Sequence, residues 1–362
     1  MKIRKEINEL LLELKRIRRQ LHMIPELGFN TYNTVKLIKQ FINIQPVDDD
    51  GISLVYYLPS NNKTIAFRCE LDGLNILEEN DIEYKSLNEY MHACGHDLHM
   101  AVMIQMINYY STHKHKPSLL FIFQPAEESG AGALHILKKN IIQKYEVQEL
   151  YAFHVLPKLG DFIGCRNGLI MAQSCEFDIT IKGNGGHLTS PNTIDSIKIS
   201  NLFLNELYKL QRELFPHKIH IGYIKGGTIC NSIAEYVVLK GTIRCLDENK
   251  MKSIKKTLEN ISIKLDKKYK SNSNIHYSIG YPPLVNHLQL VNKVKNLSED
   301  YFIEIEPLLL SEDFSYYCNF CKCCYLFCGL TTEEELHSSC FNLKEEDCLK
   351  ILELYFLIIE HS

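Results

Sequence analysis

The sequence predicts an α/β protein: a catalytic domain with a mixed, mostly parallel sheet, and an inserted lid domain of ferredoxin-like α+β topology. Over residues 1–172, short β-rich runs alternate with helical patterns, as they do around a mostly parallel sheet. Between residues 173 and 280 the order becomes strand, helix, strand, strand, helix, strand, which is that of a ferredoxin-like unit. We therefore expect a discontinuous catalytic domain over 1–172 and 281–362, with a lid and dimerisation domain at 173–280 between them.

The elements of the first domain follow from periodicity. Apolar residues recur at helical spacing from Ile3 to Leu21, and Pro25 marks the end of this helix. The expected strands are Ser53–Leu58, Thr64–Arg68, Leu119–Phe123 and Leu150–Val155, and the expected helices include His99–Tyr110 and Ala131–Lys139. Polar groups that follow parallel strands meet at one edge of the sheet, so 68–72, 124–128 and His154 are expected to share a site.

The expected elements of the inserted domain follow the ferredoxin-like order. Its expected strands are Glu176–Lys182, Ile219–Ile224, Tyr236–Cys245 and Ile275–Ile279, and its expected helices are Ile194–Leu214 and Met251–Lys267. Late in the chain, the cysteines between Cys318 and Cys328 have a spacing that could hold zinc, but CCYLFCG has the composition of a buried strand. We favour the buried strand.

Composition excludes several classes of protein. The chain has 362 residues, 45% of them hydrophobic, and a net charge of -4 without a dominant basic stripe, so we expect no nucleic-acid partner. No apolar run approaches 18 residues and no signal peptide is evident, so we expect no membrane partner and a cytoplasmic location. The thirteen cysteines are then expected to be reduced thiols.

The segment MHACGHDLHMA (91–101) places Cys94, His96, Asp97 and His99 within six positions, and LLFIFQPAEES (119–129) adds the adjacent carboxylates of Glu127 and Glu128. A thiolate, imidazoles and carboxylates are ligands for Zn, Mn, Co or Ni rather than for Mg or Ca. A free carboxylate beside such ions can move protons. The sequence therefore predicts a metal-dependent hydrolase.

Motifs along nearly the whole chain resemble, in family order, the amidohydrolase branch of the di-metal aminoacylase/carboxypeptidase family. They are LHMIPELGF (21–29), RCELDGL (68–74), MHACGHDLHMA (91–101), FIFQPAEE (121–128), FHVLP (153–157), GNGGHLTSP (183–191), GGTICNSIAE (226–235), LKGTIR (239–244), YPPLVN (281–286), SEDFSYY (311–317) and ELHSSCFNLKEE (335–346).

This resemblance implies two divalent metal ions held by five side chains. The implied ligands are Cys94, His96, Glu128, His154 and His337. Without the other motifs, a single histidine such as His154 would be read as a buried, hydrogen-bonded core residue.

The resemblance also implies the catalytic groups. Glu127 is the expected general base, although Glu127 and Glu128 could also form the first turn of a helix, where acidic residues are favoured. Asp72 is expected to orient a ligating histidine. Glu70 stands where the family usually has Asp, and its role is open. Asp97 and His99 could support the ligands or cap and pack the following helix.

On the inserted domain, the resemblance implies that His187 stabilises the oxyanion of the reaction and that Asn231 and Arg244 contact substrate, although Arg244 could equally be a surface strand residue. The expected substrate is a small N-acyl amino acid, the expected assembly is a homodimer, and NSIAE before LKGTIR favours N-acetyl-LL-diaminopimelate deacetylation in lysine biosynthesis. The alternatives are a broad hippurate-type amidohydrolase, a dipeptidase and a non-catalytic binding relative.

Overall fold

The computed structural model describes residues 2–60 and 62–362, and the chain forms two compact units. Unit 1 is Met1–Ile170, Val285–Glu306 and Asp313–Ser362, and unit 2 is Met171–Leu284 and Pro307–Glu312. Among the described residues, no helix is long and apolar enough to cross a membrane.

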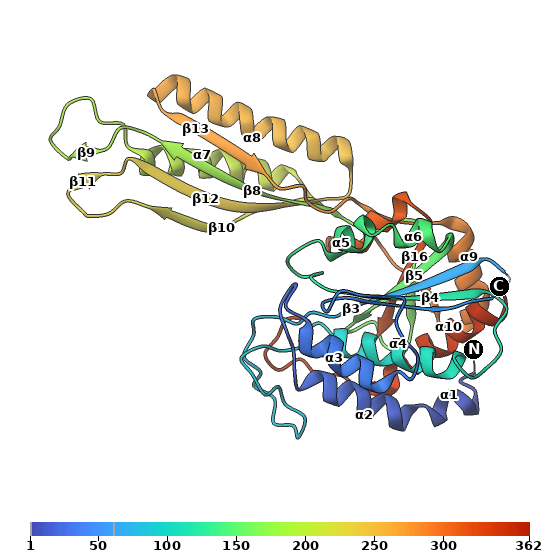
Figure 1. The fold of residues 1–362 in the computed structure, drawn as a ribbon. Coiled ribbons are helices and arrows are strands. Elements are labelled where there is room, and N and C mark those ends of the chain that lie inside the picture. The colour runs from blue at the N-terminus through green and yellow to red at the C-terminus, as the bar shows by residue number, and fades with distance from the viewer. Residues whose placement is uncertain (1, 61) are drawn as a thin grey trace. The chain divides into compact units, whose positions relative to one another are not determined.

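Unit 1 contains an eight-stranded sheet in the order β1-β2-β4-β3-β5-β16-β6-β15 (Figure 1). The strands are β1 (Asp48–Asp49), β2 (Leu54–Leu58), β3 (Thr64–Glu70), β4 (Ser118–Gln124), β5 (Val147–Leu156), β6 (Ile163–Cys165), β15 (Phe302–Glu304) and β16 (Lys322–Gly329). The central strands β4, β3, β5 and β16 are parallel to one another, whereas β1, β2 and β6 pair antiparallel to their inner neighbours. This confirms the predicted mixed, mostly parallel sheet.

The central strands are continuous apolar runs because both faces of the sheet are covered. Every residue of β3 and β4 is buried, and so is every residue of β16 after Lys322. The segment CCYLFCG is therefore a buried strand, as predicted, and its cysteines Cys323, Cys324 and Cys328 lie in the interior.

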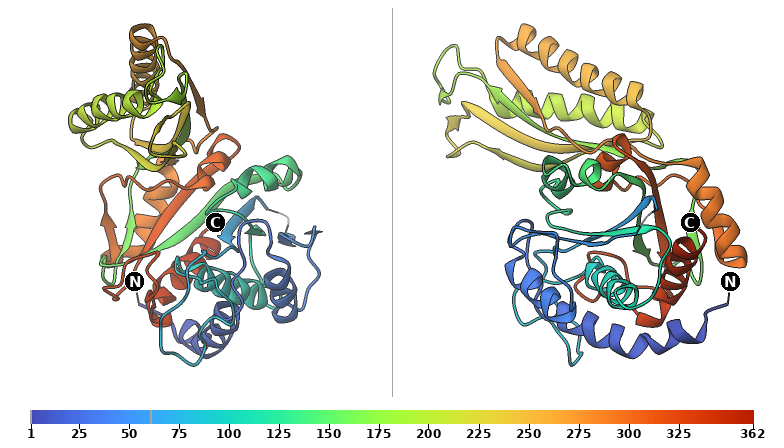
Figure 2. Two further views of the ribbon diagram at one scale, coloured as in Figure 1. Left: turned by 90° about the vertical axis from the view of Figure 1, so that its left-hand side faces the viewer. Right: turned by 45° about the vertical axis from the view of Figure 1, so that its right-hand side comes forward.

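Helices surround the sheet of unit 1, with α2, α4 and α10 on one face and α5 on the other (Figure 1, Figure 2). The helices are α1 (Lys5–Glu9), α2 (Leu11–His22), α3 (Tyr32–Phe41), α4 (His96–Tyr110), α5 (Gly132–Lys138), α6 (Ile141–Lys144), α9 (Leu288–Ser298) and α10 (Leu349–Glu360), with 3-10 turns η1 (Glu299–Tyr301), η2 (Asp313–Asn319) and η3 (Glu345–Cys348). The single helix predicted at the N-terminus is interrupted at Leu10, so that α1 and α2 are separate.

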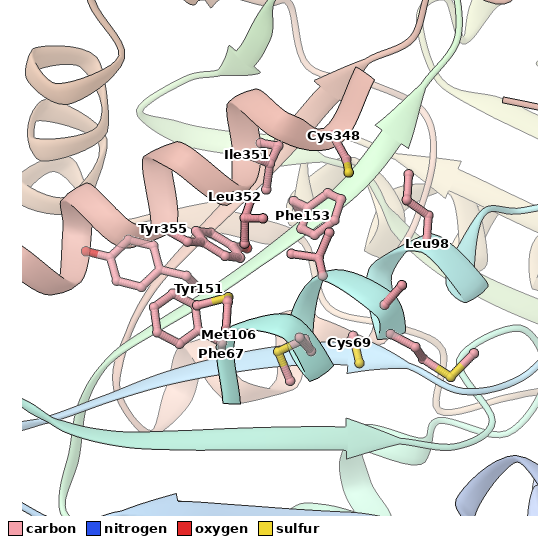
Figure 3. Close-up of a cluster of buried hydrophobic side chains, with 14 of the residues drawn as sticks. Phe67, Cys69, Leu98, Met106, Tyr151, Phe153, Cys348, Ile351, Leu352 and Tyr355 are labelled. Atoms are coloured by element: carbon pink, nitrogen blue, oxygen red, sulfur yellow. The ribbon is translucent and has the colours of Figure 1, made fainter. Parts of the chain in front are cut away.

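An aromatic and aliphatic core packs α4 and α10 against the same face of the sheet (Figure 3). Phe67 of β3 contacts Tyr355 of α10 with ring centroids 4.7 Å apart, and Leu98 and Met106 of α4 are fully buried in the same cluster. Burying side chains of this size stabilises the fold by about 1.5–3 kcal/mol each. The start of α4, where Cys94 and His96 lie, is thus held by a rigid core.

Unit 2 is built on a four-stranded antiparallel sheet in the order β10-β12-β8-β13. Its elements are β7 (Gly168–Met171), β8 (Gln173–Lys182), β9 (Gly186–His187), α7 (Ser196–Glu213), β10 (Lys218–Gly226), β11 (Ser232–Ile233), β12 (Tyr236–Cys245), α8 (Glu248–Tyr269), β13 (Asn272–Tyr277) and β14 (Leu284–Asn286), where β7 and β14 extend across the boundary of the units. Alternate residues of β8, such as Phe177 and Ile179, pack against α7 and α8 on one face of the sheet (Figure 1).

Candidate metal centre

Cys94 and His96 flank Gly95 at the start of α4, and the glycine is required by the backbone. Gly95 has φ 83°, a left-handed conformation that costs other residues energy. A Cβ at this position would also lie 2.6 Å from Cγ2 of Val155. The chain can therefore turn sharply between the two expected ligands only with glycine, which sets Cys94 and His96 on the same side.

The histidines His96 and His154 are held so that their Nε2 atoms face the centre. Nδ1 of His96 lies 2.7 Å from the carbonyl oxygen of Asp72, and Nδ1 of His154 lies 2.7 Å from that of Val155. A carbonyl oxygen only accepts, so each ring donates from Nδ1 and keeps a lone pair on Nε2. The Nε2 of His154 lies 3.2 Å from Sγ of Cys94.

Glu128 and His337 approach the same thiol from other segments. Glu128 lies in the turn that follows β4, at 127–130. The backbone N–H of His337 donates to the carbonyl oxygen of Ala93 at 2.9 Å, which fixes this late segment beside Cys94. The Nε2 of His337 is 3.3 Å from Sγ of Cys94 and 3.5 Å from Oε1 of Glu128.

The five side chains therefore form two groups that share one thiol. The ligand atoms of Cys94, His96 and His154 lie within 4.8 Å of one another, and so do those of Cys94, Glu128 and His337. Among the described residues, the buried Nε2 of His96 and Oε1 of Glu128 have no hydrogen-bond partner. Buried polar atoms are rarely left unpaired, so these atoms suit a bound cation. The donor set of thiol, imidazole and carboxylate fits two transition-metal ions.

The electrostatics of the centre agree with this assignment. Burial, followed by the negative charges of Glu128 and Glu127, raises the pKa of the Cys94 thiol. Burial lowers the pKa of His154 to about 3, so its ring is neutral at physiological pH and available as a ligand. The negative charges of these carboxylates beside a buried thiol are stabilised by nearby positive charge, which divalent ions would provide.

Asp72 contacts His96 and the two glutamates through different groups. Its carboxylate oxygen is 3.9 Å from Nδ1 of His96, and it is the main-chain oxygen of Asp72 that accepts from that ring. The carboxylate accepts the backbone N–H groups of Glu127 and Glu128, each at 3.1 Å. Asp72 thus orients His96 through its backbone and fixes the two glutamates through its side chain.

Glu127 and Glu128 lie in a turn rather than in the first turn of a helix, so the helical alternative is wrong. Both residues precede α5, which begins at Gly132, so they are not in its first turn. A ligand atom of Glu127 lies within 4.8 Å of ligand atoms of His96 and Glu128, which places the expected base beside the centre.

Two further acidic residues are committed to buried ion pairs. Oδ2 of Asp97 accepts from Nε of Arg18 at 2.7 Å and contacts Nδ1 of His22 at 2.8 Å. Glu70 pairs with Arg68 and His99. Arg68 belongs to the segment 68–72 that was expected to share the site, and its place two residues before Glu70 puts both side chains on one face of β3.

The residues expected to contact substrate lie in unit 2, and the structure brings only two of them together. His187 in β9 pairs with Ser232 in β11, and the N–H of Leu188 donates to the carbonyl oxygen of Asn231 at 3.2 Å. Arg244 lies at the other end of β12, eight residues after Tyr236 and thus about 27 Å along the strand. Its Nη1 lies 2.5 Å from Oγ1 of Thr242. Within one copy of unit 2, Arg244 is therefore remote from the other two.

Known proteins are similar to this chain over most of its length. Residues 66–361 match the model of a family described as peptidase family M20/M25/M40. The N-acetyldiaminopimelate deacetylase of Priestia megaterium is 33% identical over 344 residues, which are 90% of this chain and 92% of that protein. The protein of the same name from Halalkalibacterium halodurans is 33% identical over 348 residues, 91% of this chain and 94% of that one. A solved structure from Bacillus subtilis, described as a dinuclear metal binding peptidase of the M20 family, has a TM-score of 0.84 at 25% identity and covers 98% of this chain and 99% of its own.

Proposed function

The chain belongs to peptidase family M20/M25/M40, and on this premise we propose that it is a metal-dependent N-acetyldiaminopimelate deacetylase. The reaction consumes water and releases acetate and diaminopimelate, an intermediate of lysine biosynthesis. The observation that carries the proposal is the pair of ligand groups that share Cys94, with Glu127 beside them. The names of the deacetylases that match over nine-tenths of this chain support the choice of substrate.

The proposed ligands of two ions are Cys94, His96, Glu128, His154 and His337. Zn, Mn, Co and Ni are the candidate metals, because the donors include a thiol and imidazoles. When bound, such ions supply Lewis-acid activation of water and of the amide carbonyl. The ligand rings are already oriented by the carbonyl oxygens of Asp72 and Val155, so little ordering is required on binding.

Glu127 is the proposed proton carrier. Asp72 fixes its backbone, and its carboxylate lies close to the ligand atoms of His96 and Glu128. In the proposed reaction, Glu127 accepts a proton from the attacking water, the C–N bond of the amide breaks, and Glu127 returns the proton to the leaving amine. General-base catalysis of this kind contributes about 10²–10⁴-fold to the rate.

Unit 2 is the proposed lid of ferredoxin-like topology, with His187 as donor to the oxyanion and with Asn231 and Arg244 as substrate contacts. All three have polar groups at or near the surface of unit 2. The proposed assembly is a homodimer, supported by β10, a nine-residue strand at the edge of the sheet with exposed Tyr223 and Ile224. Light scattering on the purified protein tests the assembly.

Turnover and metal content, measured together, test the proposed reaction. Apo-protein is reloaded with individual divalent ions and assayed on N-acetyl-LL-diaminopimelate, hippurate and a dipeptide. We expect turnover of the first substrate; activity on hippurate alone would favour the hippurate-type alternative.

Two adjacent variants separate the proposed roles of the glutamates. Glu127→Gln is expected to keep its metal ions and to lose about 10²–10⁴-fold in kcat. Glu128→Gln is expected to lose metal affinity. Unchanged turnover in metal-loaded Glu127→Gln would refute the assignment of the base.

A further inference from the structure

We propose that Glu70 and His99 are positioning residues that hold the backbone at His154 and Val155, and that neither of them binds a metal ion. Both side chains are fully buried, and ligand atoms of both lie within 4.8 Å of one from His96. This proximity alone would also allow them to be ligands. The hydrogen bonds that they make decide between the two roles.

Glu70 is anchored on one side by a cation. One of its oxygens accepts from Nη1 of Arg68, and the other lies 2.7 Å from Nδ1 of His99. Arg68 is in turn held by Asp313 at 2.7 Å and by Oε1 of Gln124 at 3.0 Å. The carboxylate of Glu70 therefore has a fixed direction, and both of its oxygens are engaged within the protein.

His99 has no lone pair left for a metal ion. Its Nδ1 donates to Glu70, and its Nε2 accepts the backbone N–H of Val155 at 3.2 Å. A backbone N–H can only donate, so Nε2 must be the unprotonated nitrogen and Nδ1 the protonated one. The two partners thus fix one neutral tautomer and occupy both ring nitrogens.

The peptide that His99 holds is the one between His154 and Val155. The N–H of Val155 is bound by His99, and the carbonyl oxygen of the same residue accepts from Nδ1 of His154. A chain of hydrogen bonds therefore runs from Arg68 through Glu70, His99 and Val155 to the ring of His154. The Nε2 of that ring lies 3.2 Å from Sγ of Cys94, so the chain sets the direction of one proposed ligand.

The length of Glu70 matters for this chain. An aspartate at the same position would withdraw the carboxylate by one C–C bond, about 1.5 Å. The 2.7 Å contact with His99 would then lengthen well beyond hydrogen-bonding distance if the backbone stayed in place. We infer that the glutamate is present because it reaches both Arg68 and His99.

The inference rests on the proposed metal centre but not on the proposed substrate. Its test therefore measures metal binding and amide exchange, and no activity is needed. If the wild-type protein binds no divalent ions, the proposed function fails. If it binds them and the variants below bind equally well, only the present inference fails.

Two substitutions of His99 separate its two hydrogen bonds. In His99→Asn, the side-chain amide can replace Nδ1 as donor to Glu70, but the acceptor for Val155 is lost. In His99→Gln, the side-chain oxygen can replace Nε2 as acceptor, but the donor to Glu70 is lost. We expect faster hydrogen exchange at the Val155 amide in His99→Asn than in His99→Gln, and a 10–100-fold weaker zinc affinity in His99→Asn.

Glu70→Asp and a matched control complete the set. Glu70→Asp is expected to increase exchange at Val155 and to weaken zinc binding, although the charge is conserved. Glu78→Gln is the control, because Glu78 is equally buried and also bonds a histidine, His22, outside this chain of hydrogen bonds. Its zinc affinity should match that of the wild type. Wild-type zinc affinity in both His99→Asn and Glu70→Asp would overturn the proposal.

A measurement on the wild-type protein avoids any loss of folding in the variants. Nitrogen-15 NMR of the His99 ring should show protonated Nδ1 and unprotonated Nε2, with the same pattern before and after zinc is added. A His99 nitrogen resonance that moves to the position of a zinc-bound imidazole would show that His99 is a ligand and would refute the inference.

Discussion

Replacing Arg18 with methionine should destabilise unit 1 far more than the same change at its neighbour Arg19. Nε of Arg18 lies 2.7 Å from Asp97, and Nη1 lies 3.3 Å from Glu345, with only 1% of the Arg18 side chain exposed. Methionine keeps much of the apolar stem but leaves both carboxylates buried without this cation. Removing one partner of a buried ion pair costs about 3–5 kcal/mol.

Arg19 provides a matched control on the same helix. Its Nε lies 3.0 Å from the same oxygen of Glu345, but 42% of its side chain is exposed. Exposed ion pairs contribute about 0–1 kcal/mol. Two arginines that share one carboxylate should therefore differ by about 2 kcal/mol or more in their effect on the free energy of unfolding.

Urea unfolding followed by far-ultraviolet circular dichroism measures both variants, since the protein has no tryptophan. Burial alone would raise the pKa of Asp97, but the charge of Arg18, together with the hydrogen bond and charge of His22, outweighs it and the net pKa is lowered. In Arg18→Met, Asp97 should take up a proton more readily, so the cost of the substitution should shrink at acidic pH. Equal destabilisation by Arg18→Met and Arg19→Met would refute the reasoning.

Three further predictions concern the same unit. Burial lowers the pKa of His22, but hydrogen bonds to Asp97 and Glu78 outweigh this and the net pKa is raised. The stabilisation by His22 should be full below about pH 6.5, and it should be lost as the pH rises through the raised pKa that His22 has in the folded protein. A difference in urea midpoint between wild type and His22→Gln that grows with pH would contradict this. Gly132→Ala should lower the melting temperature and the metal content, because the added Cβ would lie 1.6 Å from the carbonyl oxygen of Pro125. Calorimetry and metal analysis measure the two effects, and wild-type values for both would refute the steric argument. Cys94→Ser should bind zinc more weakly than wild type in a competition titration with a chelator, because a hydroxyl is a poorer ligand than a thiolate; equal affinity would exclude Cys94 as a ligand.

The pattern of apolar residues predicted strands β2 to β5 of unit 1, whereas helices α3, α9 and α10 were not predicted. The runs at 54–58, 64–70, 118–124 and 147–156 are strands because continuous apolar segments must be buried on both faces. The return of Pro307–Glu312 to unit 2 had no counterpart in the pattern, because it depends on backbone pairing, such as the bridge between Met171 and Leu308.

The candidate ligands could be identified from their motifs, but their supporting contacts could not. Local spacing brings Cys94 and His96 together at the start of a helix. The use of the Asp72 carboxylate by the turn at Glu127, and the pairing of Glu70 with His99, depend on how β3, β4 and α4 meet in space. Only the structure shows from which groups each carboxylate accepts hydrogen bonds.

The position of β16 in the sheet has a consequence for synthesis of the protein. β16 pairs in parallel with β5, so residues 322–329 complete a ladder with residues 149–156, which are made much earlier. While the chain leaves the ribosome, the edge of β5 that pairs with β16 stays open until residues 322–329 have been made. The strands and helices of unit 2 between 173 and 277 emerge before that point, and they can pair with one another before β16 joins the sheet beside the proposed metal ligands.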